Sequence, residues 1–451
     1  MNFSKLPLSK AMLDTLEKLG YLSMTPIQAE SIPHIIAAKD ILAQAKTGSG
    51  KTAAFGIGVL HRLDVKNFRV QSLVLCPTRE LADQVAKELR KIAKFQHNVK
   101  ILTLCGGESF GKQFSSLSHN AHIVVGTPGR VLKHLNKGSL ELTNMQTLVL
   151  DEADRMLDMG FFEEVEAIIN FTPKSRQTLL FSATYEESVL EISKRVQHEP
   201  LHIETHIDES PNDIEEIFIK SDNKEESVVK VLSLYKPQNV IVFTNTKLAA
   251  AELAQSLQTR GIDALAIHGD LEQYERNDVL VQFANGSCPI LVATDVAARG
   301  LDIKELSMVL NFDMAHTKET YTHRIGRTGR AGAQGIAITL YEQSESLKVE
   351  EYQNDERSFK RDEELEGNST FTLAPKNVTL VIEGGKKDKL RAGDILGALT
   401  GTGVVSGSSV GKIDIYDKQS YVAIKSEDIE KALTHLKRNK IKNKNFSIWA
   451  L

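Results

Sequence analysis

The chain has 451 residues, of which 41% are hydrophobic and 25% are charged, and its formal net charge is −4. This composition is that of a folded protein long enough for two to four domains, and it excludes disorder throughout. No run of about 18 apolar residues occurs and Met1 to Pro7 contain no long apolar segment, so the sequence predicts neither a membrane span nor a signal peptide, and we expect a cytoplasmic protein.

The first half of the chain contains short apolar runs that end in small or polar residues and are separated by helical patterns. Continuous runs of this length are typical of strands in a parallel sheet that is covered on both faces. The predicted strands of this first α/β domain, residues 1–206, are 41–43, 73–76, 123–125, 148–150 and 179–181.

The same alternation of short apolar runs and helical patterns begins again after the polar stretch from Glu204 to Asn212. A second α/β domain, residues 213–345, is therefore predicted, with a cleft between the two domains. Its expected strands are 240–243, 264–267, 290–292, 308–310 and 336–338.

The pattern changes after Tyr341. In residues 346–372 acidic and basic side chains alternate too densely for a buried strand, so we expect an exposed helix or linker. Residues 373–451 then predict an α+β module in the order β-α-β-β-α-β, which is the ferredoxin-like arrangement of RNA-recognition modules. Its expected elements are strand 378–382, helix 394–399, strands 411–416 and 421–424, helix 428–436 and strand 446–449.

The charge is distributed unevenly along the chain. Residues 371–451 carry 14 Lys and Arg against 8 Asp and Glu, a net of +6, so residues 1–370 carry −10 because the whole chain carries −4. A basic nucleic-acid module attached to an acidic body and an ordinary solvated basic surface both account for this asymmetry.

The three cysteines are odd in number and widely spaced, without CxxC or His-rich neighbours. This pattern argues against disulfides and against a zinc site. We expect reduced, structural thiols at Cys76, Cys105 and Cys288.

A glycine-rich segment follows the first predicted strand and begins a helical stretch, as a phosphate-binding loop requires. Glycines let backbone N–H groups converge on phosphate oxygens, Lys51 can reach the terminal phosphates, and the Thr52 hydroxyl can bind Mg²⁺. One position departs from the general pattern. That pattern begins with a glycine, and this sequence has Ala45 in its place. The predicted ATP-binding loop consists of Ala45, Lys46, Thr47, Gly48, Ser49, Gly50, Lys51 and Thr52.

An acidic run, Asp151-Glu152-Ala153-Asp154, comes directly after the strand predicted at 148–150. Its first carboxylate would lie at the carboxyl end of a buried strand, where ligands bind in open α/β sheets. We expect Asp151 to hold Mg²⁺ and Glu152 to orient and deprotonate the attacking water.

The second α/β domain has no phosphate loop but carries an arginine-rich segment from His323 to Arg330. Such arginines could bind a phosphate backbone. Arginines that face an ATP across a cleft could instead stabilise charge on the transferred phosphoryl group, and hydrolysis would then depend on closure of the cleft.

Together these motifs resemble the DEAD-box family of RNA helicases, named for the tetrapeptide found here at 151–154, and the match covers nearly all of residues 1–345 in the expected order. The resemblance implies two RecA-like domains in tandem, with ATP and Mg²⁺ as cofactors and RNA as partner. It implies adenine recognition by Thr25 and Gln28 with Phe3 as an upstream aromatic, although a buried helix-capping glutamine is the alternative reading of Gln28.

The resemblance also assigns roles to residues in both domains. Ser182, Thr184 and His323 would couple ATP hydrolysis to strand separation, Asp302 would help to bind nucleotide, and Arg327 and Arg330 would be arginine fingers. Hydroxyls, arginines and exposed N–H groups suit a sugar-phosphate track. The implied RNA contacts are Pro77, Thr78, Arg79, Gly106, Gly107, Thr127, Gly129, Arg130, Thr246, Arg276 and Thr294.

The tail from Glu383 to Leu399 resembles the RNA-binding module of the bacterial DbpA subfamily of these helicases, which implies binding to a hairpin of 23S ribosomal RNA and a role in assembly of the large ribosomal subunit. Strand 421–424 lacks the aromatic pattern by which typical RNA-recognition motifs stack bases. RNA contact is therefore expected mainly at Lys386, Lys387, Lys389 and Arg391, while Tyr416, Tyr421 and Trp449 are possible stacking platforms or core residues.

Three functions remain open at this point. The first is an RNA-dependent ATPase and helicase. The second is a non-catalytic RNA clamp or chaperone that binds ATP without productive hydrolysis, which the presence of Glu152, Arg327 and Arg330 disfavours. The third is a DNA translocase on the same core, which the family motifs and the tail disfavour, so no DNA partner is expected.

Overall fold

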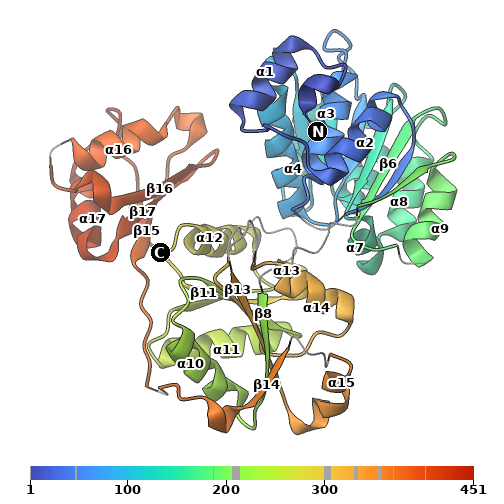
Figure 1. Cartoon of the computed structure of the whole chain (residues 1–451). Coiled ribbons are helices and arrows are strands. Elements are labelled where there is room, and N and C mark those ends of the chain that lie inside the picture. Colours follow the sequence, from blue (N-terminus) through green and yellow to red (C-terminus); the bar gives the residue numbers. More distant parts are fainter. Residues whose placement is uncertain are drawn as a thin grey trace. The chain divides into compact units, whose positions relative to one another are not determined.

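The computed structural model describes residues 2–45, 48–185, 187–205, 214–298, 306–329, 334–352, 357–368, 370–401 and 403–451. Two seven-stranded sheets and one four-stranded sheet follow one another along the chain (Figure 1). The first sheet belongs to one compact unit, and the other two belong to a second.

The first sheet is entirely parallel, with the strand order β3-β4-β2-β5-β6-β1-β7. Its strands are β1 (Ile41–Gln44), β2 (Ser72–Leu75), β3 (Ile101–Leu104), β4 (Ile123–Gly126), β5 (Thr147–Asp151), β6 (Gln177–Ser182) and β7 (Leu201–Glu204). The helices around it are α1 (Lys10–Lys18), α2 (Pro26–Ile36), α3 (Lys51–His61), α4 (Arg79–Ile92), α5 (Phe110–Leu117), α6 (Pro128–Asn136), α7 (Ala153–Asp158), α8 (Phe162–Ile169) and α9 (Glu187–Val196).

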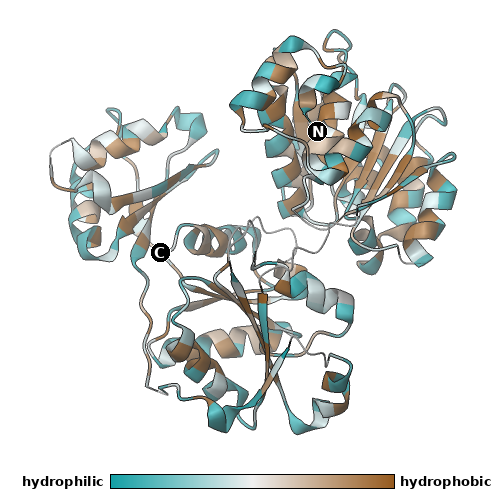
Figure 2. Ribbon diagram, viewed as in Figure 1, coloured by the Kyte–Doolittle hydropathy of each residue, from teal (hydrophilic) through white to brown (hydrophobic). Residues whose placement is uncertain are grey.

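Helices cover both faces of this sheet. Successive strand residues point to opposite faces, so Ile41 and Ala43 join one hydrophobic cluster while Leu42 joins the other. Figure 2 shows the hydrophobic strands in brown, with teal on the outward sides of the helices. The continuous apolar runs in the sequence therefore reflect burial on both sides.

The second sheet is also parallel, with the order β10-β11-β9-β12-β13-β8-β14. Its strands are β8 (Ile214–Lys220), β9 (Val240–Thr244), β10 (Ala264–Ile267), β11 (Ile290–Thr294), β12 (Met308–Asn311), β13 (Gly335–Tyr341) and β14 (Ser358–Arg361). Its helices are α10 (Lys224–Tyr235), α11 (Lys247–Thr259), α12 (Gln273–Ala284), α13 (Asp295–Ala298), α14 (Lys318–Ile325) and α15 (Ser346–Glu350).

The ten strands predicted for these two domains are all present, but the structure adds β3, β7, β8 and β14. Three of the four added strands lie at sheet edges. An edge strand is exposed to solvent, as β7 and β14 are, so its sequence contains polar residues and lacks a continuous apolar run.

The segment 346–372 differs from the expected exposed helix or linker. It forms α15 and the edge strand β14, and its side chains Val349, Tyr352 and Leu365 are buried against the second domain. Its described charged residues are exposed or half-buried, and Arg357 pairs with Glu216 at 2.7 Å, so dense charge alternation does not exclude an edge strand.

The C-terminal module has the predicted order of elements and an antiparallel sheet with the order β16-β17-β15-β18. Its elements are β15 (Asn377–Ile382), α16 (Ala392–Thr400), β16 (Val410–Ile415), β17 (Ser420–Lys425), α17 (Ile429–Arg438) and β18 (Ile448–Ala450). Helices α16 and α17 cover one face of this sheet through side chains such as Ile395 and Leu436.

The other face of the module's sheet contacts α12 of the second domain. The Tyr421 hydroxyl donates a hydrogen bond of 2.7 Å to Asp278, and the Asn285 amide donates one of 2.9 Å to the Thr379 hydroxyl. Between these bonds, Val281 packs against Val381 and Tyr421. Part of the surface on which RNA-recognition modules usually stack bases is therefore occupied by a helix of the same chain.

Candidate functional site

The strand order of the first sheet separates the predicted motifs into two groups at one edge. The ATP motifs follow β1, β5 and β6, which are neighbours in the order β5-β6-β1. The RNA motifs follow β2, β3 and β4, which are neighbours in the order β3-β4-β2. Because the strands are parallel, all six loops leave the sheet at its carboxyl edge, where α/β sheets bind ligands.

The phosphate loop leads from β1 into α3. Gly48 and Gly50 have φ angles of +88° and +95°, a conformation that favours glycine. The Ala45 N–H donates to the Ser182 carbonyl across 2.9 Å, which ties the beginning of the loop to β6. Lys51 then begins α3, so the loop delivers its lysine at a helix N-terminus, where phosphate groups bind. Lys46 and Thr47 lie outside the described residues.

The acidic run lies beside this loop at the end of β5. The pKa of Asp151 is raised to about 7, mainly because the carboxyl is buried; Lys51 opposes this shift and the nearby Glu152 adds to it. Glu152 has a φ angle of +52°, and its carboxylate accepts a hydrogen bond of 2.7 Å from Arg155. Both members of that ion pair are buried, with side chains 8% and 3% exposed.

In the phosphate loop, the acidic run and the end of β6, four buried polar side-chain atoms have no hydrogen-bond partner among the described residues. They are Ser49 Oγ, Lys51 Nζ, Asp151 Oδ1 and Ser182 Oγ. Buried polar groups in proteins are nearly always satisfied, so such a set is expected where a polar ligand binds. One ammonium, one carboxylate and two hydroxyls match the phosphates and Mg²⁺ of a nucleotide.

The predicted adenine residues lie next to this loop. Gln28 accepts a bond of 3.0 Å from the Thr25 N–H and donates one of 3.1 Å to the Gly50 carbonyl. It therefore caps α2, as the alternative reading proposed, and it also contacts the phosphate loop. Phe3 is 3% exposed, and the edge of its ring meets that of Tyr21.

The Ser182-Ala183-Thr184 segment contacts the acidic run through Asp154. One oxygen of Asp154 accepts bonds from the Ala183 N–H at 2.9 Å and the Thr184 N–H at 3.2 Å, and the Thr184 hydroxyl lies 3.5 Å away. This contact is thus made mainly by backbone N–H groups. Any shift of the acidic run would act on this segment directly.

The RNA group of the first domain is built on helix starts and one glycine turn. Thr78, preceded by the buried Pro77, caps α4, and Thr127 precedes α6. Gly107, which follows Gly106, has a φ angle of +72°, and a Cβ there would lie 2.1 Å from the Arg79 guanidinium. Arg130 donates to the Glu108 carbonyl and to Gln113, while Gly129 beside it is exposed.

The second domain repeats this arrangement. Its predicted RNA residues follow β9, β10 and β11, which are again neighbours at one end of the sheet. Thr246 is exposed and caps α11, Arg276 on α12 donates to the His268 carbonyl at 3.3 Å, and Thr294 ends β11. These three residues are therefore grouped at the carboxyl edge of this domain.

The arginine-rich segment contains one residue whose role the sequence did not reveal. Arg324 is 1% exposed, pairs with Asp295 through two hydrogen bonds of 2.7 and 2.8 Å, and also bonds to Asn245. It therefore connects the loops after β9 and β11. Of the other predicted residues, Arg327 is buried and His323 half-buried, while Arg330 and Asp302 lie outside the described part of the chain.

The predicted RNA-binding cations of the C-terminal module, Lys386, Lys387, Lys389 and Arg391, are all exposed. The Lys442 ammonium donates to the Lys389 carbonyl at 2.7 Å, so the basic residues at the chain's end lie beside this loop. Tyr421 is buried on α12, whereas Tyr416 and Trp449 remain exposed.

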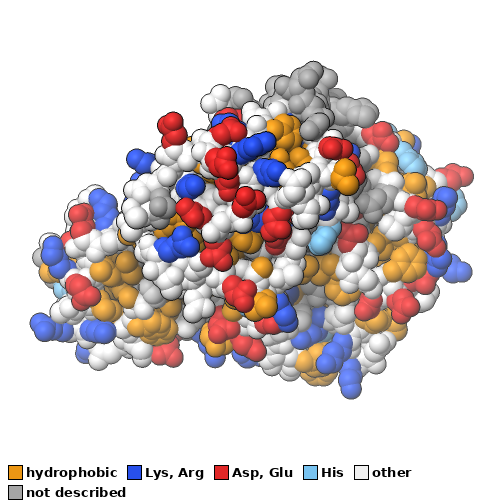
Figure 3. Space-filling model, turned by 90° about the horizontal axis from the view of Figure 1, so that it is seen from below, with side chains coloured by type: hydrophobic (Ala, Val, Ile, Leu, Met, Phe, Trp, Pro, Cys, Tyr) orange, Lys and Arg blue, Asp and Glu red, His pale blue; other side chains and the backbone are white. Residues whose placement is uncertain are grey.

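Acidic and basic groups are otherwise mixed. On the face of the molecule that Figure 3 shows, Lys and Arg side chains are interspersed with Asp and Glu side chains.

The three cysteines are free and buried, as expected. Among the described residues there is no cluster of His, Cys, Asp and Glu that could hold a metal, and no helix long and apolar enough to cross a membrane.

Comparison with known proteins agrees with this arrangement. Residues 25–192 match the DEAD/DEAH box helicase domain, residues 223–332 the helicase conserved C-terminal domain, and residues 379–450 the DbpA RNA binding domain. The chain is 50% identical over 441 residues to the ATP-dependent RNA helicase DbpA of Escherichia coli, a match that covers 97% of this chain and 96% of that one. The chain belongs to the DEAD-box family of RNA helicases.

Other members of the family resemble this helicase over its two large domains. The RNA helicase CshA of Bacillus cereus is 46% identical over 379 residues, which cover 81% of this chain and 71% of CshA. Among solved structures, Dbp5 of S. cerevisiae bound to RNA and ADP BeF3 is 30% identical with a TM-score of 0.72, and the match covers 80% of this chain and 95% of that one.

This DEAD-box helicase is therefore an ATP-hydrolysing enzyme that acts on RNA and carries a third, RNA-binding domain. The predicted fold of two RecA-like domains with a small antiparallel module is confirmed. Membership of the family decides against the clamp without productive hydrolysis and against the DNA translocase.

Proposed function

We propose that this helicase separates short stretches of RNA near a hairpin of 23S ribosomal RNA, to which its C-terminal module directs it, and that it acts in the cytoplasm during assembly of the large ribosomal subunit. The observation that carries the proposal is the DbpA RNA binding domain at residues 379–450. A core that grips a sugar-phosphate backbone cannot choose a sequence, so selection requires a separate module.

Chemistry would take place in the ATP half of the first domain. Lys51 would bind the β- and γ-phosphates, and Thr52 and Asp151 would hold Mg²⁺, which neutralises developing charge on the phosphates when bound. Glu152 would accept the proton of the attacking water. The unpartnered Lys51 Nζ and Asp151 Oδ1 atoms support this assignment.

RNA would follow the loops after β2, β3 and β4 in the first domain and those after β9, β10 and β11 in the second. In our proposal Arg327 and Arg330 complete the ATP site only when RNA binds both domains at once. Stabilisation of the transition state by arginine would then depend on RNA.

Replacement of Glu152 by Gln tests the catalytic assignment. The amide keeps the shape of the side chain and its bond to Arg155 but cannot accept a proton, so we expect unchanged ATP binding and a loss in kcat of at least about 100-fold. Steady-state ATPase measurements with saturating RNA would show this loss. Glu163→Gln, an exposed change on α8, is the matched control, and undiminished turnover in Glu152→Gln would remove Glu152 from the mechanism.

Neutralising three cations of the module tests the targeting. In the full-length chain, Lys386→Gln, Lys387→Gln and Arg391→Gln together should abolish the preference for the ribosomal hairpin. Each lost phosphate contact should also weaken the salt dependence of binding. The control is the triple Gln variant of Lys425, Lys431 and Lys437, which removes three exposed cations elsewhere in the module.

ATPase stimulation by a panel of ligands completes the test. The panel contains a 23S hairpin fragment, an unrelated hairpin, single-stranded RNA and DNA of the same sequences. We expect the 23S fragment to stimulate at the lowest concentration and DNA not to stimulate. Equal stimulation by the two hairpins would refute the targeting proposal.

A further inference from the structure

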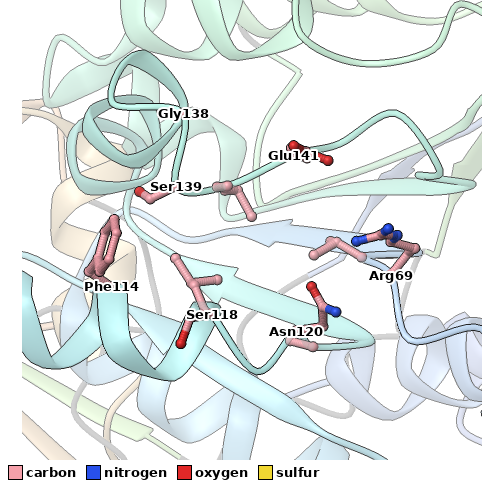
Figure 4. Close-up of a pocket in the computed structure, with 11 residues that line it drawn as sticks. Arg69, Phe114, Ser118, Asn120, Gly138, Ser139 and Glu141 are labelled. Atoms are coloured by element: carbon pink, nitrogen blue, oxygen red, sulfur yellow. The ribbon is translucent and has the colours of Figure 1, made fainter.

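A cavity of about 250 Å³ lies in the first domain, away from the ATP and RNA loops. Figure 4 shows its walls: Phe114 from α5 and Ser118 just after that helix, Gly138 and Ser139 beyond α6, and Arg69 opposite Phe114. The full lining consists of Arg69, Val70, Phe114, Leu117, Ser118, Asn120, Ala121, Gly138, Ser139, Leu140 and Glu141.

The cavity lies at the amino edge of the sheet. Arg69 and Val70 precede β2, and Asn120 and Ala121 precede β4, whereas the proposed RNA residues follow the same strands. Helix α6 connects the two edges, since it begins beside Thr127 and ends just before Gly138. Its nine residues span about 13 Å, a distance that a few extended nucleotides can cover.

One face of α6 carries a row of cations between the RNA loops and the cavity. Arg130, Lys133 and Lys137 are three and four residues apart, which places them on one side of the helix, and Lys133 and Lys137 are exposed. Residues 99–141 contain five Lys and Arg against two Glu, although residues 1–370 as a whole carry −10. An excess of positive charge along this segment suits a polyanion, although α8, which contacts α6, carries Glu163, Glu164 and Glu166.

Aromatic side chains of α5 stand beside these cations. Phe110 stacks on His134 with ring centroids 4.2 Å apart, and its centroid lies 6.0 Å from the Arg130 guanidinium and 5.6 Å from the Lys133 ammonium. One helical turn further, Phe114 is 51% exposed at the rim of the cavity. Cations interleaved with aromatic rings characterise surfaces that bind single-stranded nucleic acid.

We propose that this cavity binds a nucleobase of single-stranded RNA that continues along α6 from the RNA loops. The base stacks on Phe114, its polar edge meets Ser118, Asn120 or Glu141, and its phosphates lie near Lys137 and Arg69. The inference rests on the proposed RNA track, because Arg130 belongs to both. It extends the RNA contact of the first domain by a second site, which no motif of the core supplies.

The charge of the surroundings favours RNA over a peptide as the occupant. Of the two carboxylates in residues 99–141, Glu108 lies 4.0 Å from Arg79, and Glu141 is the acidic residue that lines the cavity. A carboxylate there can accept a hydrogen bond from the amino group of a base. An apolar peptide would need neither the row of cations nor the aromatic ring.

Binding of oligonucleotides of two lengths tests the proposal. With the full-length chain and a non-hydrolysable ATP analogue, we expect Phe114→Ala to weaken binding of a single strand of about 14 nucleotides by at least about fivefold and to leave a strand of about 6 nucleotides unaffected. Phe114→Tyr should restore binding, whereas Phe114→Leu, which keeps an apolar side chain, should not. Phe171→Ala, at another exposed phenylalanine of the same domain, is the matched control.

The outcomes separate this inference from the function on which it rests. If the short strand stimulates the ATPase of every variant but the long strand binds Phe114→Ala as tightly as the unmodified chain, the cavity does not bind RNA and the proposed function stands. Full binding of the long strand by Phe114→Leu would show that an apolar side chain suffices and that no base stacks on Phe114, which would overturn the proposal. A free nucleoside monophosphate could also bind at Phe114. If its binding were lost in Phe114→Ala and were not displaced by the long strand, the cavity would belong to a free nucleotide, and this result would equally overturn the proposal.

Discussion

At the scale of single residues, the ion pair between Glu152 and Arg155 decides where the proposed general base points. Its two atoms are 2.7 Å apart and both side chains are buried. A buried charge that loses its partner is strongly destabilising, because nothing replaces its lost hydration. Arg155 therefore positions Glu152, and it belongs with the residues that the sequence motifs did not reveal.

Removal of Arg155 should destabilise the first domain. We expect Arg155→Ala to lower the free energy of unfolding by about 3–5 kcal/mol, since Glu152 is left buried and unpaired. Denaturant unfolding of the full-length chain would measure this. Arg195→Ala is the control, because Arg195 pairs with Glu166 and Glu191 at the exposed surface, and a loss as large as that of Arg155→Ala would show that burial is not the cause.

At the scale of elements, the loop after β3 requires glycine for two reasons. Gly107 has a φ angle of +72°, and an added Cβ would lie 2.1 Å from the Arg79 guanidinium on α4. The loop and the first residue of the neighbouring helix are therefore packed against each other. Because both are proposed to contact RNA, their spacing should matter for binding.

Gly107→Ala should weaken the affinity for RNA, and this loss of binding free energy should exceed the loss in the free energy of unfolding. The left-handed backbone costs about 1–2 kcal/mol with a side chain present, and Arg79 must also move. Fluorescence titration with single-stranded RNA would report the affinity. The control is Gly111→Ala inside α5, where the nearest atom to an added Cβ is 3.9 Å away, and equal affinity in both variants would contradict the role of this loop.

At the scale of the whole molecule, the contact between α12 and the C-terminal module would connect the proposed selection of RNA to the proposed RNA contact of the second domain. The same helix carries Arg276 near its start and Val281 within the contact. A module held on this helix presents its RNA in one orientation to the second domain. A flexibly tethered module would only raise the local concentration of RNA.

A charge within this contact should release the module. We expect Val281→Lys to make the segment between Leu373 and Asn377 accessible to protease and to reduce stimulation by the ribosomal hairpin several-fold, with stimulation by plain single strands unchanged. Limited proteolysis and ATPase titrations would measure both effects. Leu234→Lys, at an exposed position of α10, is the control, and protection of the segment in Val281→Lys would refute the contact's role.

Sequence patterns predicted the elements whose signal is local. A strand buried on both faces is a continuous apolar run, as in β5 and β9, and all ten strands predicted from such runs are present. Strand β14 falls in the segment where an exposed helix or linker is predicted, because an edge strand has exposed, charged residues. The partners of Arg324, which lie 11 to 79 residues away, could not be read from the sequence at all.

The sequence by itself therefore determined the fold class and the family and proposed the ATP and RNA motifs, because each of these depends on residue type and spacing along a short segment. Only the tertiary structure decided how the motifs are grouped, since the strand order brings β5, β6 and β1 together at one end and β3, β4 and β2 at the other. It also decided that Tyr421 packs on α12 and that Arg155 holds Glu152. Such contacts depend on the packing of distant segments, which no local pattern encodes.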